Sequence, residues 1–488
     1  MRFVLTPAEM SAADRHAIDA GTPESVLVER AGGAVARQAR RMLGGVYGRR
    51  VTVVAGQGNN GADGRVAARR LRANGVGVDE FLLEAGVDEP AFMRAVSRAD
   101  LVIDAMYGTG FRGELEGAAA TIAALLNASP VPVLSVDIPS GVRGATGSVH
   151  GSAVRAREMI CFAAYKPGLL FEPGRSFAGR VSVIDIGIAI DTTGTPQLAV
   201  LDAHDLALPT PAVSSHKWSS GLLVVGGSSG MVGAPLLAGS AALRTGAGMV
   251  VCAVPGSAAA AQVSGQELVA RALPATADAA LDEDAAAAVL KELGRYRALA
   301  IGPGLGRDPR TQAAIRRIVA EGDTAMVIDA DALNAIAVDP SVLEARHNAG
   351  LPSAVLTPHD GEYERLAGRS VGEDRVAAAR ELAARLHAIV LLKGPATVIA
   401  APGGRAVVNR TGGPALATAG TGDVLTGVIA GLVAQGVDPF DAAATGAYLH
   451  GRAAEAARPA PDIVASDLVR ALPRTLKALR TGRDPWET

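Results

Sequence analysis

Short runs of apolar residues alternate with longer stretches of helical character along most of the chain, and this alternation begins again near the middle. Continuous apolar runs of strand length are typical of strands buried on both faces of a parallel sheet. The runs in the first part are 51–55, 78–83, 101–105, 133–136, 159–163 and 181–186. Those in the second part are 222–225, 249–254, 298–301, 325–328, 354–357 and 389–392. Strand–helix alternation predicts the α/β fold class, with a doubly wound sheet in the first part.

Cap and turn residues predict where the helices begin. Thr6, Pro7 and Glu9 follow the pattern of a capping box at the start of a first helix, and the Thr-Pro pair at 22–23 begins a second. The alanine-rich stretch 277–288 is expected to join a surface loop to the start of a helix. The chain is expected to close with a hairpin of two short strands and three long helices, at 397–400, 406–408, 423–435, 439–457 and 466–480.

The alternation weakens between residues 187 and 217. Turn-forming residues gather there, at 192–196 and at 209–211. The 488 residues also exceed the size at which a single hydrophobic core stops growing, roughly 250–300 residues. We therefore place a domain boundary near residue 198, which gives domains 1–198 and 199–488.

The composition is that of a globular chain without a strong charge bias. Hydrophobic residues make up 49% and charged residues 20% of the chain, and the net charge is −2, from 47 Lys and Arg against 49 Asp and Glu. Such a balance gives no general attraction to nucleic acid or to an anionic membrane. A polyanionic ligand would have to be held locally, by loops and helix ends.

Two further features bear on the compartment. Cys161 and Cys252 lie far apart and outside any CxxC pair, which predicts two reduced, buried thiols. The N-terminus lacks the apolar core of a signal peptide, and no uncharged apolar run reaches the ~20 residues that span a bilayer. We expect a cytoplasmic protein with neither a membrane nor a nucleic-acid partner.

A glycine-rich loop follows the first predicted strand. Residues 56–61 fit the GxGxxG pattern, in which glycines let phosphates approach the backbone and a helix N-terminus attracts anions. The same pattern also occurs in plain tight turns. What favours a site is the insertion of Asn59 and Asn60, with Asp63 close behind, because these side chains offer oxygen ligands and hydrogen bonds.

Two further predicted strands end in residues of the same kind. Asp104 precedes a glycine-rich loop at 108–113, and Asp137 is followed closely by Ser140. Ligands bind at the carboxyl ends of the strands in an open α/β sheet, so Asn60, Asp104, Asp137 and Ser140 are expected to converge on one crevice. For a single acid, helix capping is the simpler interpretation. Three loops that combine glycine with Asp or Asn favour a binding site.

About the first two hundred residues resemble a known family. The motifs are GQGNNGADG, VIDAMYGTGFRG, SVDIPSG and AYKPG, and they are similar to those of the Rossmann-like NAD(P)H-hydrate epimerase domain. The resemblance implies that Asn60, Asp104 and Ser140 bind a potassium ion, consistent with hard oxygen donors. It implies that Asp137 contacts the reacting ring as an acid or base, with Lys166 as a second catalytic residue. It implies that the hydrated nucleotide is held by Asn59, Asn60, Gly61, Ala62, Asp63, Gly108, Thr109, Gly110, Phe111, Arg112, Gly113, Glu114 and Asp137.

The second part carries a candidate phosphate site. Gly420, Thr421 and Gly422 precede an apolar helix, so free backbone N–H groups and a helix N-terminus would form an anion hole for a phosphoryl group. Asp423 beside it is the natural base for a substrate hydroxyl, and the less favoured interpretation is that it only caps the helix. Other glycine-rich or charged strand ends lie at 301–306, 329–334, 357–362 and 393–397.

Together these segments resemble the ribokinase-like ADP/ATP-dependent NAD(P)H-hydrate dehydratase over roughly residues 200–480. The motifs, in the family's order, are GGSSGMVGAP, IGPGLG, DADALN, LTPHDGE, KGPAT and AGTGD. The resemblance implies that the hydrate is contacted by Ala234, Gly304, His359 and Asp423. It implies that ADP or ATP, with Mg²⁺, is held by Lys393, Gly394, Pro395, Ala396, Thr397 and Gly422. A histidine after a strand is also often only a capping or packing residue.

Three positions depart from the family patterns. Ala62 stands where the epimerase motif usually has glycine, and it would be strained if that position requires a positive φ. Trp218 stands where the dehydratase motif HKGxxG has glycine, and Met231-Val232 replaces a more aromatic, proline-containing loop. These departures put the shape of the substrate loops in doubt.

The leading hypothesis is a bifunctional enzyme that repairs NADH and NADPH whose nicotinamide ring has added water. The first domain would interconvert the R and S epimers at the carbon bearing the hydroxyl. The second would phosphorylate the hydroxyl of the S epimer, and loss of phosphate, a better leaving group than hydroxide, would restore NAD(P)H. The partners expected are these small molecules, the adenine nucleotide and further copies of the chain in a homo-oligomer.

Three alternatives stay open. One is a vitamin-type kinase of the ribokinase superfamily fused to a nucleotide-binding, Rossmann-like domain, in which Asp423 would generate a stable phosphate ester. Another is an N-terminal domain that only binds nucleotide or protein, which convergence of the four crevice residues would argue against. A third is an NAD-dependent dehydrogenase, for which Asp79 lies about where a ribose-binding acid falls and against which Asn59 and Asn60 argue.

Overall fold

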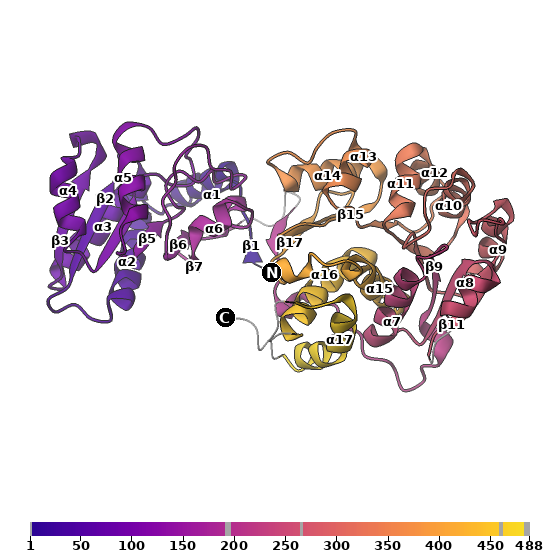
Figure 1. Ribbon diagram of the computed structural model, residues 1–488. Helices are drawn as coiled ribbons and strands as arrows, with labels where there is room; N and C mark the ends of the chain where they lie inside the picture. The colour runs from indigo at the N-terminus through magenta and orange to yellow at the C-terminus, as the bar shows by residue number, and fades with distance from the viewer. Residues whose placement is uncertain (1, 191–196, 264–266, 458–461, 483–488) are drawn as a thin grey trace. The chain divides into compact units, whose positions relative to one another are not determined.

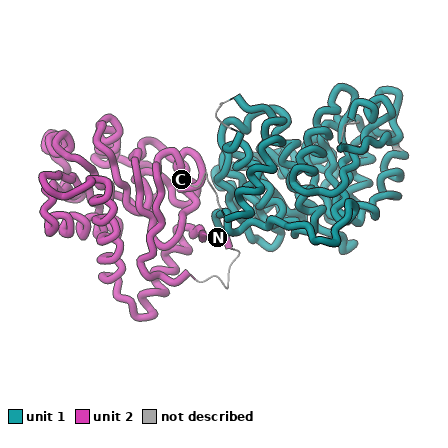
Figure 2. The backbone as a smooth tube through the Cα atoms, turned by 90° about the horizontal axis from the view of Figure 1, so that it is seen from below, with its two compact units in different colours: residues 1, 198–488 teal, residues 2–197 magenta. Residues whose placement is uncertain are grey.

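The computed structural model describes residues 2–190, 197–263, 267–457 and 462–482. The chain forms two compact units, residues 2–197 and residues 198–488, which Figure 2 shows in different colours. The turn expected at 192–196 lies outside the described residues. Within these ranges, no helix is both long and apolar enough to cross a membrane.

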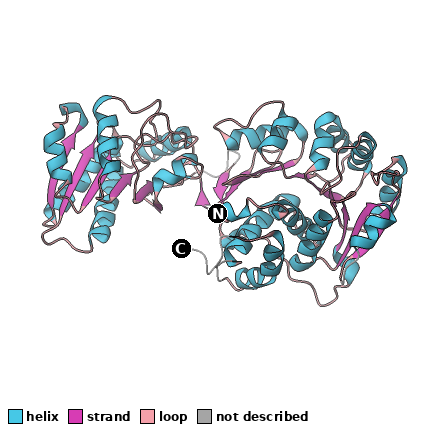
Figure 3. Cartoon of the chain, in the orientation of Figure 1, coloured by secondary structure: helices cyan, strands magenta, loops and turns pink. Residues whose placement is uncertain are grey.

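The N-terminal unit is built on a six-stranded sheet with the order β3-β2-β4-β5-β6-β7, in which every neighbouring pair is parallel (Figures 1 and 3). The six strands of this sheet are β2 (Arg50–Ala55), β3 (Gly77–Leu82), β4 (Leu101–Ala105), β5 (Val133–Val136), β6 (Glu158–Phe162) and β7 (Arg180–Ile184), and the short strand β1 (Arg2–Phe3) lies outside it. Its helices are α1 (Pro7–Asp19), α2 (Glu24–Leu43), α3 (Asn59–Ala73), η1 (Leu83–Ala85), α4 (Glu89–Val96), α5 (Gly117–Ala128), η2 (Pro167–Leu169) and α6 (Gly174–Ala178).

Helices cover both faces of this sheet because the strand side chains alternate between two cores. Val51 and Val53 of β2 pack with residues of α2 and α3, whereas Val54 packs with residues of α4 and α5. The doubly wound α/β fold is therefore confirmed. The strand order reverses between β2 and β4, and ligands bind at such a switch point in open α/β sheets.

Local sequence signals explain how α1 begins and how closely α2 and α3 pack. The Thr6 hydroxyl accepts a hydrogen bond from the Glu9 backbone N–H at 3.3 Å, and the Glu9 carboxylate accepts one from the Thr6 N–H at 2.7 Å, so the predicted capping box is formed. Gly32 of α2 faces α3 so closely that a Cβ there would lie 2.5 Å from the Cβ of Val66. The small residue lets α2 hold α3 against the sheet.

The C-terminal unit has a sheet in which the strands follow the order β8-β17-β16-β15-β14-β13-β12-β9-β10-β11. The pairs from β15 to β11 are parallel, and the predicted hairpin of β16 and β17 is antiparallel. Its strands are β8 (Leu198–Val200), β9 (Gly221–Val225), β10 (Met249–Pro255), β11 (Val269–Leu273), β12 (Ala298–Ile301), β13 (Ala325–Ile328), β14 (Val355–Leu356), β15 (Ile389–Leu392), β16 (Thr397–Ala400) and β17 (Ala406–Asn409).

The helices of this unit lie on both faces of its sheet, with α7 and α15–α17 on one face and α10–α14 on the other (Figure 1). They are η3 (Ala203–Asp205), η4 (Lys217–Ser220), α7 (Gly233–Thr245), α8 (Gly256–Val263), α9 (Glu283–Leu293), α10 (Pro309–Glu321), α11 (Asp331–Val338), α12 (Ser341–Asn348), α13 (Asp360–Ala367), α14 (Arg375–Leu386), η5 (Pro414–Leu416), α15 (Thr421–Ala434), α16 (Pro439–Ala456) and α17 (Ala465–Arg480). The alanine-rich stretch 277–288 contains a turn and the start of α9, and the strands β8 and β11 are additions to the predicted set.

Helix α15 positions the second site. Its residues from Val424 to Ala434 are all buried, and it packs directly on α7. A Cβ on Gly427 would lie 2.0 Å from the carbonyl oxygen of Ala238 in α7, so only glycine fits this contact. The close packing fixes the first turn of α15 at the carboxyl end of the central strands.

Candidate active sites

The first site lies at the switch point of the N-terminal sheet, where β2 turns into α3. A Cβ on Gly56 would lie 2.0 Å from the carbonyl oxygen of Met106, and one on Gly61 would lie 1.8 Å from the carbonyl oxygen of Gly56. These contacts require glycine and press the loop after β2 against the loop after β4. Gly58 is the N-cap of α3 and offers no side-chain cap, so the helix N-terminus stays available to an anion.

The loop of residues 106–109 contacts all four residues that were expected to converge. The Met106 N–H donates to Asp104 at 3.3 Å, and the Tyr107 N–H donates to Ser140 Oγ at 3.0 Å. The Thr109 N–H donates to Asp137 Oδ2 at 2.9 Å. A Cβ on Gly108 would lie 3.2 Å from the Cβ of Asn60 and 3.3 Å from Asp137 Oδ2. The structure therefore gathers these residues around one short segment.

Asp104 is fully buried and bonded to Ser140 through both of its oxygens. Its Oδ1 accepts the Ser140 hydroxyl at 2.6 Å, and its Oδ2 accepts the Ser140 N–H at 3.0 Å and the Ser135 hydroxyl at 2.9 Å. Burial raises the pKa of Asp104, although the hydrogen bonds from Ser140 act in the opposite direction. The result is a dense cluster of oxygen atoms beneath the switch point.

Asn60 is the polar residue that the surrounding protein leaves unsatisfied. The oxygen and the nitrogen of its side-chain amide are both buried and have no hydrogen-bond partner among the described residues. Buried polar atoms without a partner are rare in native structures. An amide oxygen held in this way is a suitable ligand for a hard cation.

Asp137 is held by a lysine that is buried completely. Asp137 has a φ of 64°, and its Oδ1 lies 2.9 Å from Lys166 Nζ. That ammonium group also donates to the Phe162 carbonyl at 2.8 Å and to Cys161 Sγ at 3.4 Å. Burial by itself would lower the pKa of Lys166, but the charge of Asp137 outweighs it and the pKa is raised. Lys166 thus remains a cation and fixes the orientation of the Asp137 carboxylate.

A cavity of about 730 Å³ opens over these residues. Of the predicted substrate-binding residues, Asn59, Asn60, Asp63, Gly108, Thr109, Gly110, Phe111 and Asp137 line it, together with the catalytic candidate Lys166. Asp104, Ser140 and Gly61 are buried outside the lining, Ala62 is half-buried outside it, and Arg112, Gly113 and Glu114 are exposed outside it. Ala62 is helical and has no positive φ, so the expected strain is absent.

Sequence reasoning missed the wall that α1 contributes. Met10, Ser11, Asp14 and Ile18 line the cavity, and their spacing places them on one face of that helix. Burial raises the pKa of Asp14, and burial together with the charges of Asp137 and Asp14 raises the pKa of Asp63 to about 8. Asp63 is therefore a neutral carboxylic acid near pH 7 and can donate a hydrogen bond.

The second site surrounds the first turn of α15. Gly420, with a φ of 87°, is the N-cap, so Asp423 lies within the first turn and does not cap the helix. A Cβ on Gly422 would lie 3.8 Å from Lys393 Nζ and 4.0 Å from Asp329 Oδ2, which places a partly buried cation beside the glycine turn. Burial, and next the charge of Asp329, raises the pKa of Asp423 to about 6. That value is suited to a general base near neutral pH.

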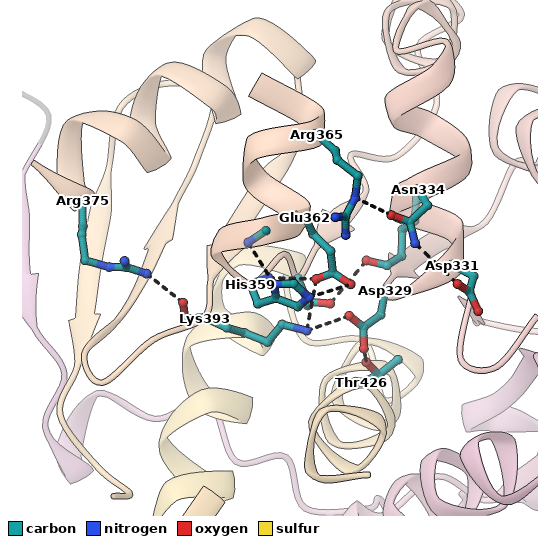
Figure 4. A network of polar contacts seen from close by, with 12 residues as sticks. Asp329, Asp331, Asn334, His359, Glu362, Arg365, Arg375, Lys393 and Thr426 are labelled. Carbon is teal, nitrogen blue, oxygen red and sulfur yellow. Dashed lines mark hydrogen bonds and ion pairs between the residues drawn. The ribbon is translucent and has the colours of Figure 1, made fainter. Parts of the chain in front are cut away.

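Figure 4 shows the network that holds Lys393 at this position. Asp329 is buried at the end of β13; its Oδ1 accepts Lys393 Nζ at 2.9 Å and its Oδ2 accepts the Thr426 hydroxyl at 2.6 Å. Glu362 lies 3.7 Å from the same ammonium group. Burial by itself would lower the pKa of Lys393, but the charges of Asp329 and Glu362 outweigh burial, and the pKa is raised. Neither Asp329 nor Glu362 was predicted as a site residue, although both belong to motifs that the sequence singled out.

The other predicted residues of this unit lie at neighbouring strand ends. Gly304 has a φ of 71°, and a Cβ there would lie 3.3 Å from the Cβ of Ala234, so these two expected substrate contacts adjoin each other. His359 is exposed and caps α13, accepting the Gly361 N–H at 3.0 Å. The capping role that we weighed for His359 is therefore present, and its exposed ring has Nε2 3.6 Å from Glu362 Oε1.

The segment 393–397 forms a turn that Arg375 fixes. Arg375 donates to the Lys393 carbonyl at 2.8 Å and pairs with Asp360 at 2.8 Å. A Cβ on Gly394 would lie 2.7 Å from Arg375 Nη2, so a larger residue there would displace the guanidinium group. Trp218 packs against Tyr296, with ring centroids 5.8 Å apart, and does not enter this turn.

Comparison with known proteins covers both units. The family model described as NAD(P)H-hydrate dehydratase matches residues 222–474, and that described as YjeF-related protein N-terminus matches residues 24–91 and 84–168. The bifunctional NAD(P)H-hydrate repair enzyme of Moorella thermoacetica is 40% identical over 98% of this chain and 97% of its own length. The enzyme of the same name from Escherichia coli K12 is 33% identical over 89% of this chain and 87% of its own. A solved ADP/ATP-dependent NAD(P)H-hydrate dehydratase from Bacillus subtilis is 31% identical, with a TM-score of 0.46, over 58% of this chain and 98% of that one. The chain belongs to the family of bifunctional NAD(P)H-hydrate repair enzymes.

Proposed function

We propose that the two units carry out consecutive steps in the repair of hydrated NADH and NADPH. The N-terminal unit interconverts the R and S epimers of the hydrate, and the C-terminal unit removes water from the S epimer with the help of an adenine nucleotide. The observation that carries this proposal is the pair of carboxylates at strand ends. Asp137 faces a cavity of about 730 Å³, and Asp423 lies beside a glycine turn and the partly buried ammonium group of Lys393.

In the epimerase step, a bond to the hydroxyl-bearing carbon must break and form again on the other face, which requires a proton to be given and withdrawn. Asp137 lines the cavity and can exchange a proton with the bound ring. Lys166 holds that carboxylate in place. The N-terminus of α3 and the loop of residues 106–109 are suited to hold the phosphates and ribose of the nucleotide.

A potassium ion fits the residues beneath this cavity. The unsatisfied amide oxygen of Asn60 and the buried oxygen cluster of Asp104 and Ser140 are hard donors, and a monovalent cation there would compensate their negative potential. When bound, the ion would supply positive charge beside the substrate. The residues themselves fix the loop of 106–109 and so the floor of the cavity.

In the dehydratase step, Asp423 accepts the proton of the substrate hydroxyl, whose oxygen attacks the terminal phosphorus of ADP or ATP. The bridging P–O bond breaks, and the nucleotide leaves shortened by one phosphate. The backbone N–H groups of the first turn of α15 and the Lys393 ammonium group are placed to stabilise the charge on the transferred group. The ring C–O bond of the ester then breaks, the neighbouring carbon loses a proton, and inorganic phosphate leaves with the oxygen of the former hydroxyl. Mg²⁺ is expected to enter with the nucleotide phosphates.

The test is to incubate the protein with pure R and S epimers of hydrated NADH, with ADP, with ATP and without nucleotide, and to separate the products by chromatography. We expect epimerisation without nucleotide, and NADH only when ADP or ATP is present. Epimerisation should rise with potassium concentration in a buffer made with a bulky organic cation. Equal epimerisation in potassium-free buffer would contradict the cation site, and a stable phosphate ester as the end product would indicate a kinase instead.

A further inference from the structure

The groups along the cavity of the N-terminal unit follow one another in an order that suits the parts of a dinucleotide. Along the strand order β5, β4, β2, β3, the carboxyl ends carry Asp137, the loop 106–109, the glycine loop and finally Glu84. Neighbouring strands lie about 4.8 Å apart, so β5 and β3 are separated by roughly 14 Å. A ring at Asp137 and phosphates at the N-terminus of α3 direct the adenosine half of the nucleotide toward β3.

Glu84 is the acid at that far end. It lies in η1, which follows β3 directly, and it lines the cavity. Its side chain is exposed and makes no hydrogen bond or ion pair with the described residues, so the carboxylate is available to a ligand. Asp79, which the sequence pointed to for such a role, instead pairs with Arg50 at 3.0 Å and lies outside the cavity lining.

The charge around the cavity is strongly one-sided. Its described lining includes the acids Asp14, Glu24, Glu84 and Asp137 besides the neutral Asp63, and Lys166 is the basic residue among them, already paired with Asp137. Hydrated NADH and hydrated NADPH differ only at the adenosine ribose, which carries a free 2′-hydroxyl in one and a 2′-phosphate in the other. A carboxylate accepts strong hydrogen bonds from a ribose diol, but it repels a phosphate.

We propose that Glu84 binds the adenosine ribose diol and makes the N-terminal unit select hydrated NADH over hydrated NADPH. The inference rests on the proposed epimerase function and specifies its substrate. In the wild-type protein, kcat/KM for epimerisation should be at least about tenfold higher for hydrated NADH. The repulsion acts through solvent, so raising the ionic strength should narrow that ratio.

The experiment measures epimerisation of the pure R epimers of both hydrates by the full chain, without adenine nucleotide so that only this step proceeds. Glu84→Gln keeps the shape of the side chain and removes its charge, and it should bring the ratio of the two kcat/KM values to within about threefold. Glu84→Lys should favour hydrated NADPH. Glu89→Gln, at an exposed acid of α4 outside the cavity lining, is the matched control and should keep the wild-type ratio.

A wild-type protein that epimerises both hydrates equally well would overturn the inference while leaving the epimerase function in place. The same holds if Glu84→Gln keeps the wild-type ratio. Failure to epimerise either hydrate would overturn the proposed function, and with it this inference. Because Glu84 is exposed, the variants should fold normally, which their melting temperatures can verify.

Discussion

Asp423 differs from the other buried carboxylates of its unit in having no hydrogen bond from the described residues. Asp329 is held by Lys393 and Thr426, and Glu362 accepts the His359 N–H at 2.9 Å. A carboxylate without committed donors is free to take up a proton from a ligand. We therefore expect Asp329 and Glu362 to position Lys393, and Asp423 to act as the base.

Replacing Asp423 with Asn should remove the base and keep the fold. General-base loss usually lowers the rate by ~10²–10⁴, and we expect a drop of that size in dehydratase turnover. The melting temperature should hardly change, because Gly420 is the N-cap of α15 and Asp423 has no capping role to lose. Turnover, thermal melting and ADP binding are measured together. Near-normal turnover, or failure only through unfolding, would contradict the role of Asp423.

The dehydratase rate should fall in mildly acidic solution. The pKa of Asp423 is raised to about 6, so this carboxylate is deprotonated and active above that pH and protonated below it. The turnover number should therefore be level above about pH 7 and drop tenfold per pH unit well below 6. After burial, the charge of Asp329 contributes most to raising the pKa of Asp423. Asp329→Asn removes that charge, so the acidic limb of the pH profile, where turnover falls, should move to lower pH.

Thr426→Val is the control for that shift, because it removes a hydrogen bond to Asp329 and leaves the charge in place. Its acidic limb should stay near pH 6. A wild-type limb close to pH 4 would show that Asp423 has an ordinary pKa in the working enzyme. If Asp329→Asn leaves the acidic limb unmoved, the charge of Asp329 does not raise the pKa of the base.

At the scale of elements, contacts made by small residues set the positions of both sites. Gly56 and Gly61 allow the glycine loop to touch the loop after β4, and Gly427 allows α15 to touch α7. Each contact joins segments that are distant in the sequence. The sites are thus fixed by backbone packing more than by the side chains that perform the chemistry.

Gly427→Ala should destabilise the C-terminal unit although alanine is the better helix former. In an open helix position the change would stabilise by up to about 1 kcal/mol. Here the new Cβ would lie 2.0 Å from the Ala238 carbonyl oxygen, and overpacking of this kind typically costs about 1–3 kcal/mol. Gly233→Ala, where a Cβ meets nothing within 4 Å, is the comparison in thermal melting. An equal or higher melting temperature for Gly427→Ala would contradict the close contact.

Most elements that sequence reasoning predicted have continuous apolar runs of four residues or more, whereas the missed strand β8 is apolar but only three residues long. All six predicted strands of the N-terminal sheet are present within a residue or two; the four central ones are buried, and the edge strands β3 and β7 are only half-buried but still lie within the predicted runs. β11 escaped prediction because it mixes exposed and buried residues at the sheet edge. Asp14 was missed because a single acid on an amphipathic helix has no local signature. The pairing of Asp329 with Lys393 links residues 64 positions apart, which no short motif can indicate.

At the scale of the whole molecule, each unit has its own sheet and its own buried clusters. The cores of the N-terminal unit are drawn from residues before 190, and the large core of the C-terminal unit from residues after 198. Units of this kind should fold and act separately. The expected homo-oligomer stays a prediction.

Asp137→Asn should abolish epimerisation and leave dehydration of the pure S epimer intact. The change leaves the buried Lys166 cation without its counter-charge, so the N-terminal unit should also lose stability, but the C-terminal unit owns a separate core. Mixing this variant with Asp423→Asn should restore repair of the R epimer, because each chain supplies the step that the other lacks. Loss of dehydratase activity in Asp137→Asn would show that the units are coupled.

The buried lysine of the N-terminal unit has a consequence for covalent labelling. Lys217, Lys291 and Lys477 are exposed and should react readily with amine-acylating reagents, whereas Lys166 is fully buried and held as a cation. An amine in such a position reacts only when its surroundings open, at a rate set by that opening. Lys166 is therefore an internal reporter for the opening of the N-terminal site, readable by peptide mass spectrometry, and the partly exposed Lys393 should react at an intermediate rate.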